Sequence, residues 1–164
     1  MALAYFITFS TYGTWLHGGE KSSVDVEHNV FGTPFLEADM QRERRERAVM
    51  SQAAYVMGEA ERKIVCKAVV ELAADRDWRL LAAHVRSNHV HVVVQGERVP
   101  ARMMSDIKAR ASRDLTAAGF DDAQRRRWTR HGSTRHLFRE EEVEGALRYT
   151  LDEQGERMAS YAFR

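Results

Sequence analysis

Cysteine and proline are almost missing from this chain of 164 residues, which contains one cysteine and two prolines. A single cysteine, Cys66, cannot form an internal disulfide, so disulfide-stapled secreted domains are excluded and we expect a cytoplasmic protein. Long apolar runs are also missing: no stretch approaches the roughly 18 residues that cross a bilayer, so we expect no membrane partner. Residues 1–9 lack the basic start and small-residue cleavage site of a secretory signal, and their composition favours a strand.

An excess of charge is likewise absent, because 25 Lys and Arg residues stand against 24 Asp and Glu residues, a net charge of +1. The net charge predicts neither a nucleic-acid partner nor its absence, so the distribution of charge is more informative. Arginines cluster within residues 42–47 and 125–139, whereas glutamates gather at 140–144, where they favour the N-terminal end of a helix. The arginine clusters suit either a solvated surface or phosphate contacts, and both interpretations stay open at this point.

Hydrophobic residues make up 44% of the chain and charged residues 30%, the balance of an ordinary globular protein. No low-complexity tract or internal repeat interrupts the sequence, so we predict one domain over residues 1–164. The predicted elements follow from hydrophobic periodicity and turn residues. In chain order they are a strand at 3–10, a long irregular insert from Thr11 to Asp39, helical sequence at 39–75 (firmest over 59–75), strands at 78–85 and 89–95, a helix from Pro100 to Gly119, a short strand at 134–138 and a helix at 140–153.

This order of elements determines the expected fold class. Without the insert, the first six elements match the βαββαβ pattern of a ferredoxin-like α/β sandwich, which belongs to the α+β class. We therefore predict an antiparallel sheet with two helices on one face, a long insert after the first strand, and a C-terminal helix that carries Tyr149. Many unrelated functions use this fold, so the function depends on particular side chains.

The sharpest local feature is the run Asn88-His89-Val90-His91, which three valines follow. Alternate side chains of a strand share a face, so His89 and His91 point the same way and their imidazoles can converge on one metal ion. Two histidines leave most coordination positions of a metal open, which suits catalysis better than a structural site. The pair could also be a half-exposed polar face, but two polar rings in an apolar stretch are costly unless they have a use. His84, on the neighbouring strand, is predicted to be a packing or hydrogen-bonding residue.

The last predicted helix carries Tyr149 and two oxygen-bearing side chains near its end, Glu153 and Gln154. Residues four apart lie on a common helical face, so Glu153 shares the face of Tyr149, whereas Gln154 projects about 140° around a regular helix. A tyrosine and an oxygen ligand on one face could meet a metal held by the strand histidines. Taken alone, Tyr149 is also typical of an amphipathic residue at the edge of a core.

Four short motifs are spread over almost the whole chain. They are FITFSTYGTWL at 6–16, AHVRSNHVHVVV at 83–94, Trp128 with HGS at 131–133, and ALRY at 146–149 followed by Gln154 and Gly155. Together they resemble the HUH single-tyrosine transposase superfamily, and most closely the REP-associated tyrosine transposases. The histidine motif alone is modest evidence, and a tyrosine helix about 58 residues later makes the resemblance strong.

The resemblance implies a specific chemistry. In such enzymes the two histidines, here His89 and His91, bind a divalent ion, Mg²⁺ or Mn²⁺. The tyrosine, here Tyr149, attacks a phosphodiester of single-stranded DNA and gives a 5′-phosphotyrosine and a free 3′-hydroxyl. A polar residue four positions after the tyrosine commonly supplies the third metal ligand. That position is Glu153, where Asn or Gln is more usual; helical geometry favours Glu153, with Gln154, one residue later, as the alternative.

The resemblance also implies single-stranded DNA, with hairpin or repeat ends, as the partner of a monomer or a homodimer. Side chains that could contact this DNA are basic or aromatic. The predicted DNA-binding residues are Arg125, Arg126, Arg127, Arg130, Arg135, Trp15 and Trp128. The two tryptophans could equally anchor the insert to the core.

The expected function is therefore metal-dependent cleavage and strand transfer of single-stranded DNA, by a transposase or nickase. One alternative is a non-catalytic, nucleic-acid-binding ferredoxin-like domain derived from a transposase, although the intact His89, His91 and Tyr149 argue against it. Another alternative is an unrelated metal hydrolase, which would use the histidine pair without a protein–DNA bond and without Tyr149.

Overall fold

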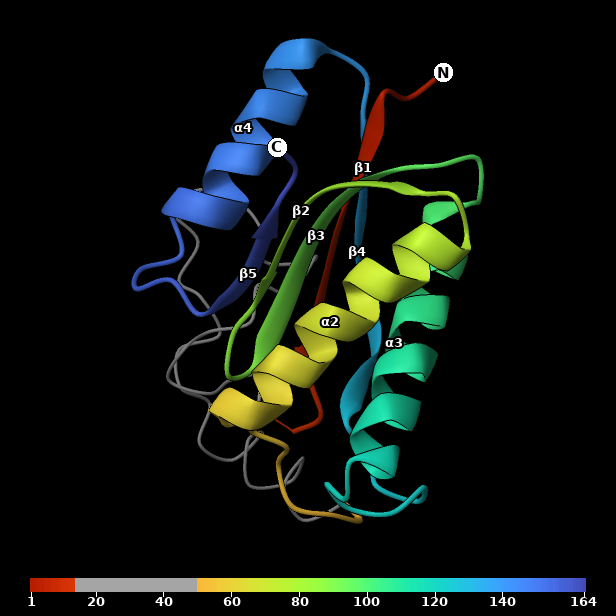
Figure 1. Ribbon diagram of the computed structural model, residues 1–164, viewed down its shortest axis with the longest axis vertical. Helices are drawn as coiled ribbons and strands as arrows, with labels where there is room; N and C mark the ends of the chain where they lie inside the picture. The colour runs from red at the N-terminus through yellow and green to blue at the C-terminus, as the bar shows by residue number, and fades with distance from the viewer. Residues whose placement is uncertain (14–49) are drawn as a thin grey trace, which may run out of the picture.

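The computed structural model describes residues 1–13 and 50–164 (Figure 1). Most of the predicted insert, including Trp15, and the first part of the helical sequence at 39–75 lie outside the described residues. The described elements are β1 (Ala4–Thr11), α2 (Glu59–Asp75), β2 (Arg79–Val85), β3 (His89–Gln95), α3 (Pro100–Ala117), β4 (Trp128–Leu137), α4 (Glu140–Asp152) and β5 (Ala159–Ala162).

The described strands form a five-stranded antiparallel sheet in the order β4-β1-β3-β2-β5. The order β4-β1-β3-β2, with α2 and α3 as the crossover helices, is that of a ferredoxin-like sandwich, so the predicted α+β fold is confirmed. Strand β5 adds to the free edge of β2 and was not predicted, because four residues are too few to show a periodicity.

Helices α2 and α3 lie side by side over one face of the sheet (Figure 1). They pack on strand residues that point to this face, among them Ile7, Phe9 and Val92, and so form the main core. Helix α3 begins at Pro100, whose fixed φ angle suits the first helical turn. Its buried stripe repeats at helical spacing: Met103, Ile107, Ala111 and Leu115.

Helix α4 lies on the opposite face, on a smaller apolar cluster. There Ala146 of α4 packs with Val93 of β3 and Leu137 of β4. Val93 is two residues beyond His91, so the alternation of strand side chains places the histidines on the face that α4 covers. The sheet therefore has a helix-filled core on one side and a shorter, partly covered surface on the other.

Most predicted boundaries are confirmed, and the bounds of α2 and β3 agree at both ends. Strand β4 begins at Trp128 rather than at 134, because its first half is an exposed edge without apolar alternation. Helix α4 ends at Asp152 rather than at 153, which changes the position of the residues that follow. In the described part of the chain, no helix is long and apolar enough to cross a membrane.

Candidate active site

The imidazoles of His89 and His91 lie next to each other on the α4 side of β3. Their ring centroids are 4.8 Å apart and the rings are inclined by 77°. Nδ1 of His91 is 2.9 Å from Oγ1 of Thr8 on β1, and Nδ1 of His89 is 2.6 Å from Oδ1 of Asn88. The Nε2 atoms of both rings are directed to the same oxygen, Oε1 of Gln154, at 3.1 Å from His91 and 3.4 Å from His89.

The hydrogen bonds around the two rings determine where their lone pairs point. The Asn88 carboxamide oxygen only accepts, so Nδ1 of His89 carries the proton, and the Thr8 hydroxyl can accept from Nδ1 of His91 in the same way. The Nε2 lone pairs then face the carbonyl oxygen of Gln154, whose own amide nitrogen donates to the backbone oxygen of Tyr149 at 3.1 Å. Three electron-rich atoms converge, which is the arrangement that suits a cation.

Burial keeps His91 neutral. The residue is only 4% exposed, and removal of the charged ring from water, together with the nearby His89, lowers the pKa of His91 to about 3. A neutral imidazole is the form that can bind a metal. The pair therefore fits a metal site in both geometry and protonation state.

Gln154 reaches the histidines because the chain leaves the helix before it. Helix α4 ends at Asp152, and the left-handed Gly155 (φ +78°) turns the chain toward β5. His84, fully buried in β2, connects both sides of this turn: its Nδ1 donates to the Thr150 oxygen at 2.8 Å, and its Nε2 accepts from the Met158 N–H at 2.9 Å. The prediction that His84 is a hydrogen-bonding residue is confirmed, and its two bonds hold the turn that carries Gln154.

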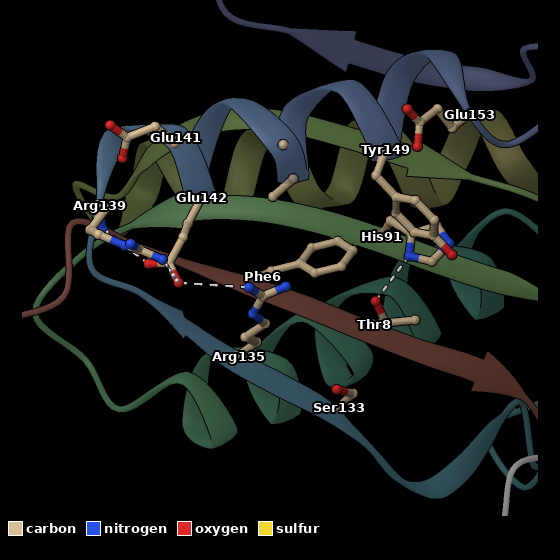
Figure 2. Close-up of a pocket in the computed structure, with 12 residues that line it drawn as sticks. Phe6, Thr8, His91, Ser133, Arg135, Arg139, Glu141, Glu142, Tyr149 and Glu153 are labelled. Atoms are coloured by element: carbon tan, nitrogen blue, oxygen red, sulfur yellow. Dashed lines mark hydrogen bonds and ion pairs between the residues drawn. The ribbon is translucent and has the colours of Figure 1, made fainter. Parts of the chain in front are cut away.

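Glu153, which helical geometry favoured as the third ligand, does not join the two histidines. No group of three or more His, Cys, Asp or Glu side chains suited to a metal occurs in residues 1–13 and 50–164. Figure 2 shows the Glu153 carboxylate beside the α4 ribbon and apart from the His91 ring. The preference for Glu153 assumed a helix that continues through residue 154, and the observed end of α4 removes this assumption.

Tyr149 lies directly beside the histidines in the same chain. Its ring meets His91 edge-on, with centroids 5.5 Å apart and an inclination of 80°, and it packs in the same way on Phe6 of β1. The side chain is 43% exposed, and Figure 2 shows that it projects from α4 toward the His91 ring. The phenol from the C-terminal helix and the imidazoles from the strand therefore converge, as the sequence predicted.

A cleft of about 770 Å³ opens between α4 and the β1–β4 edge of the sheet (Figure 2). This volume is within the range of pockets that hold small organic ligands, about 300–1,000 Å³. Its lining residues are Phe6, Thr8, His91, Ser133, Arg135, Arg139, Glu141, Glu142, Gly145, Ala146, Tyr149 and Glu153. A substrate in this cleft would contact Tyr149 and the edge of the histidine pair together.

Arg127, one of the predicted DNA-binding residues, is part of the protein interior. It is 2% exposed, and its guanidinium donates to the Phe120 oxygen at 2.6 Å and to Oγ1 of Thr116 at 3.0 Å. A buried guanidinium committed to these acceptors cannot contact a phosphate backbone in solution. The prediction of a DNA contact for Arg127 is therefore corrected to a structural role, which a run of arginines in the sequence does not reveal.

The other predicted DNA contacts divide into two groups. Arg125 donates a hydrogen bond to the carbonyl oxygen of Ala53 and lies over the Tyr55 ring. The Trp128 indole donates to Oγ of Ser112 at 2.8 Å. Both residues therefore stabilise local structure. The exposed members of the set are Arg126, Arg130 and Arg135, and of these Arg135 lines the cleft. Trp15 lies outside the described residues.

Two residues that orient the histidines, Thr8 and Asn88, were not predicted as part of the site. Alternation along β1 places Thr8 on the face opposite to Ile7, but only the register between β1 and β3 brings it to His91. Such a register depends on contacts between residues far apart in the sequence, so no local pattern predicts it. The signal for Asn88 was its position directly before the histidine run.

No protein-family model and no curated protein matches the chain. Among solved structures, the chain is similar to a REP-associated tyrosine transposase bound to a REP hairpin, with a TM-score of 0.48 and 11% sequence identity. That match covers 90% of this chain and 64% of the other, so the chain spans less than two thirds of that transposase. It is also similar to a candidate transposase from Deinococcus radiodurans R1, with a TM-score of 0.46, 13% identity and coverage of 97% and 94%.

Proposed function

We propose that this protein is a metal-dependent enzyme that cleaves and rejoins single-stranded DNA, with Tyr149 as the nucleophile. The single observation that carries the proposal is the convergence of His89 Nε2, His91 Nε2 and Gln154 Oε1 beside the Tyr149 ring. A phenol next to a cluster of neutral donors in an open cleft has the parts that attack on a phosphodiester requires.

His89, His91 and Gln154 would hold the divalent ion, Mg²⁺ or Mn²⁺, in this proposal. Their three neutral donors leave other coordination positions for substrate oxygens and water. When bound, the ion supplies a Lewis acid that offsets the charge of the attacked phosphate. Thr8 and Asn88 keep the histidine lone pairs on the ligand side, and His84 holds the turn that carries Gln154.

Tyr149 performs the covalent step. Its Oη forms a bond to phosphorus while the bond from phosphorus to the 3′-oxygen breaks; the phenol loses its proton and the 3′-oxygen leaves as a hydroxyl. The product is a 5′-phosphotyrosine and a free 3′-hydroxyl, with the energy of the broken bond stored in the new ester. Attack by a 3′-hydroxyl on this ester restores the DNA backbone without ATP. The partial exposure of Tyr149 lets it reach a strand in the cleft.

The experiment incubates the protein with Mn²⁺ and end-labelled, single-stranded hairpin DNA, followed by denaturing electrophoresis. We expect label that migrates with the protein, and a loss of this adduct by more than about a thousandfold in Tyr149→Phe, since removal of a nucleophile has effects of this size or larger. The matched control is Tyr161→Phe in β5, which makes the same change outside the cleft and keeps the adduct.

Other outcomes would assign other functions. An undiminished adduct in Tyr149→Phe refutes the nucleophile. Tight DNA binding by the wild-type protein without cleavage indicates a binding module, and cleavage without any adduct indicates a metal hydrolase that uses the histidine pair alone.

A further inference from the structure

The cleft has a second end, away from the histidines, at the start of α4. Figure 2 shows Arg135 of β4 and Arg139 beside α4 at this end, with Phe6 between them and His91. The side chains of both arginines are largely exposed, 63% for Arg135 and 74% for Arg139. Two cations therefore face the space that continues from Tyr149.

Glu142 forms ion pairs with both arginines. Its Oε2 accepts hydrogen bonds from the backbone N–H groups of Phe138 at 2.8 Å and Arg139 at 3.1 Å, which cap the start of α4. Its Oε1 pairs with Arg135 at 3.7 Å and with Arg139 at 3.6 Å. This single negative charge pairs with two guanidiniums and also accepts hydrogen bonds from the backbone. The three side chains therefore carry a net positive charge, which can attract an anion.

Two further carboxylates line the cleft, those of Glu141 and Glu153. Figure 2 shows both beside the α4 ribbon and neither over the ring of Phe6. An anion next to Arg135 would therefore approach the cleft floor, on the side of the sheet, where neither of these carboxylates lies.

Gly145 of α4 lines the cleft between its two ends, and it has no side chain to fill the space there. It lies in the interior of α4, one turn before Tyr149 and on the same side, and a Cβ added to it would meet no atom within 4 Å. Glycine is unfavourable in a helix interior, and neither its backbone angles nor its packing requires glycine at this position. The absent side chain provides room for a ligand that contacts the helix closely.

We infer that this end of the cleft is a subsite for one nucleotide of the single strand, the one adjoining the phosphodiester that Tyr149 attacks. Its phosphate binds Arg135 and Arg139, and its sugar and base lie against Gly145 and Phe6. The inference rests on the proposed function for its orientation relative to the cut. A basic groove with an aromatic floor is the surface that binds a single strand without reading its sequence.

The test measures binding of a fluorescent single-stranded oligonucleotide by anisotropy, with a chelator present so that cleavage plays no part. Gly145→Leu fills the cleft, and we expect it to weaken binding about tenfold or more, the effect of losing one stacked nucleotide. The same variant should melt no lower than the wild-type protein, because leucine favours the helix and meets no neighbour there. Ala101→Leu, on an exposed position of α3, is the matched control and should bind normally.

The arginines are tested by salt dependence. The double variant Arg135→Gln/Arg139→Gln should make the plot of log K against log salt shallower by about 0.7, the value for one phosphate contact on a single strand. The control double variant Arg76→Gln/Arg113→Gln, on exposed positions near α2 and α3, should keep the wild-type slope.

The outcomes separate this inference from the proposed function. Wild-type binding by Gly145→Leu, or an unchanged salt slope in the Arg135/Arg139 variant, overturns the subsite even if the Tyr149 adduct forms. Weakened binding by Gly145→Leu together with a shallower salt slope in the Arg135/Arg139 variant supports the subsite even if no adduct is found, and in that case the covalent chemistry alone is wrong.

Discussion

The two faces of the central sheet are built from the same strands, yet they carry different side chains and are covered to different extents. Ile7 of β1 pairs in register with Val92 of β3, and both are 0% exposed beneath α2 and α3. The next pair along β1, Thr8 and His91, points to the other face, carries a hydrogen bond and lines the cleft. A shift of one residue thus separates the core from the candidate active site.

The difference shows how one small sheet can support both a stable core and a candidate active site. Helices α2 and α3, with 17 and 18 residues, cover their face and exclude water from it. Helix α4 has 13 residues and covers only part of the opposite face, so polar strand residues near its end stay reachable. The face with less helical cover can therefore keep a site for substrate while the other face maintains the fold.

The largest effect is expected on the core face. Ile7→Ala removes buried methyl groups from a fully packed position and should lower the free energy of unfolding by about 2–5 kcal/mol. Urea titration of the metal-free protein measures this change. Mn²⁺ affinity of the folded variant should stay close to wild type, and a large loss of affinity without a loss of stability would contradict the division between the faces.

The next prediction distinguishes two neighbours on the site face. Gln154→Ala removes the oxygen that both Nε2 atoms face, and Mn²⁺ affinity should fall by about 100-fold or more, since loss of outer-shell partners alone costs about 10- to 100-fold. Glu153→Ala is the matched control and should change the affinity little. Titration calorimetry measures both; the reverse order of effects would restore Glu153 as the ligand.

The pH dependence of stability gives a third distinction. The pKa of His91 is lowered to about 3 in the folded protein, from an ordinary value near 6.5, because the ring is buried. Above pH 6.5 His91 is neutral in both the folded and the unfolded protein, and its titration costs no stability. As the pH falls from 6.5 toward about 3, His91 binds a proton in the unfolded protein but not in the folded protein. The free energy of unfolding therefore falls over this range.

For His91 alone this loss amounts to about 2 kcal/mol between about pH 7.5 and about pH 5. Urea titration with a chelator at both values measures it. The loss should shrink in His91→Gln but persist in His136→Gln, which changes an exposed histidine. An equal loss in wild type and His91→Gln would show that His91 is not the responsible group.

The smallest effect is expected from the hydrogen bond that orients His91. Thr8→Val keeps the shape of the side chain but removes the acceptor for Nδ1, so Mn²⁺ affinity should fall by about tenfold. Thr8→Ser retains the hydroxyl and should restore most of this affinity. Equal affinities in the Val and Ser variants would mean that Thr8 acts by packing alone.

The fold and the histidine pair could be predicted from the sequence because local patterns encode them. Alternation over β3 places His89 and His91 on one face, and helical spacing defines α2 and α3. The role of Gln154 could not be predicted, because it depends on the end of α4 at Asp152 and on the turn at Gly155.

The residues predicted to contact DNA were the part of the site that the sequence indicated least well. Arg127 and Arg135 belong to the same basic stretch, yet Arg127 is buried against carbonyl oxygens and Arg135 lines the cleft. The two arginines differ in their tertiary contacts, because the acceptors of Arg127 lie at the end of α3 and in the loop after it. The role proposed for Gly145 also has no signal in the sequence, because it depends on the open space beside this residue.

The most direct test of the central claim is a crystal structure with Mn²⁺, with the ion located by its anomalous scattering. We expect a peak bounded by His89 Nε2, His91 Nε2 and Gln154 Oε1, next to the Tyr149 ring. A peak that contacts Glu153 instead of Gln154 would contradict the proposed ligand set. Absence of any peak between the two imidazoles, at Mn²⁺ concentrations that support cleavage, would contradict the metal site itself.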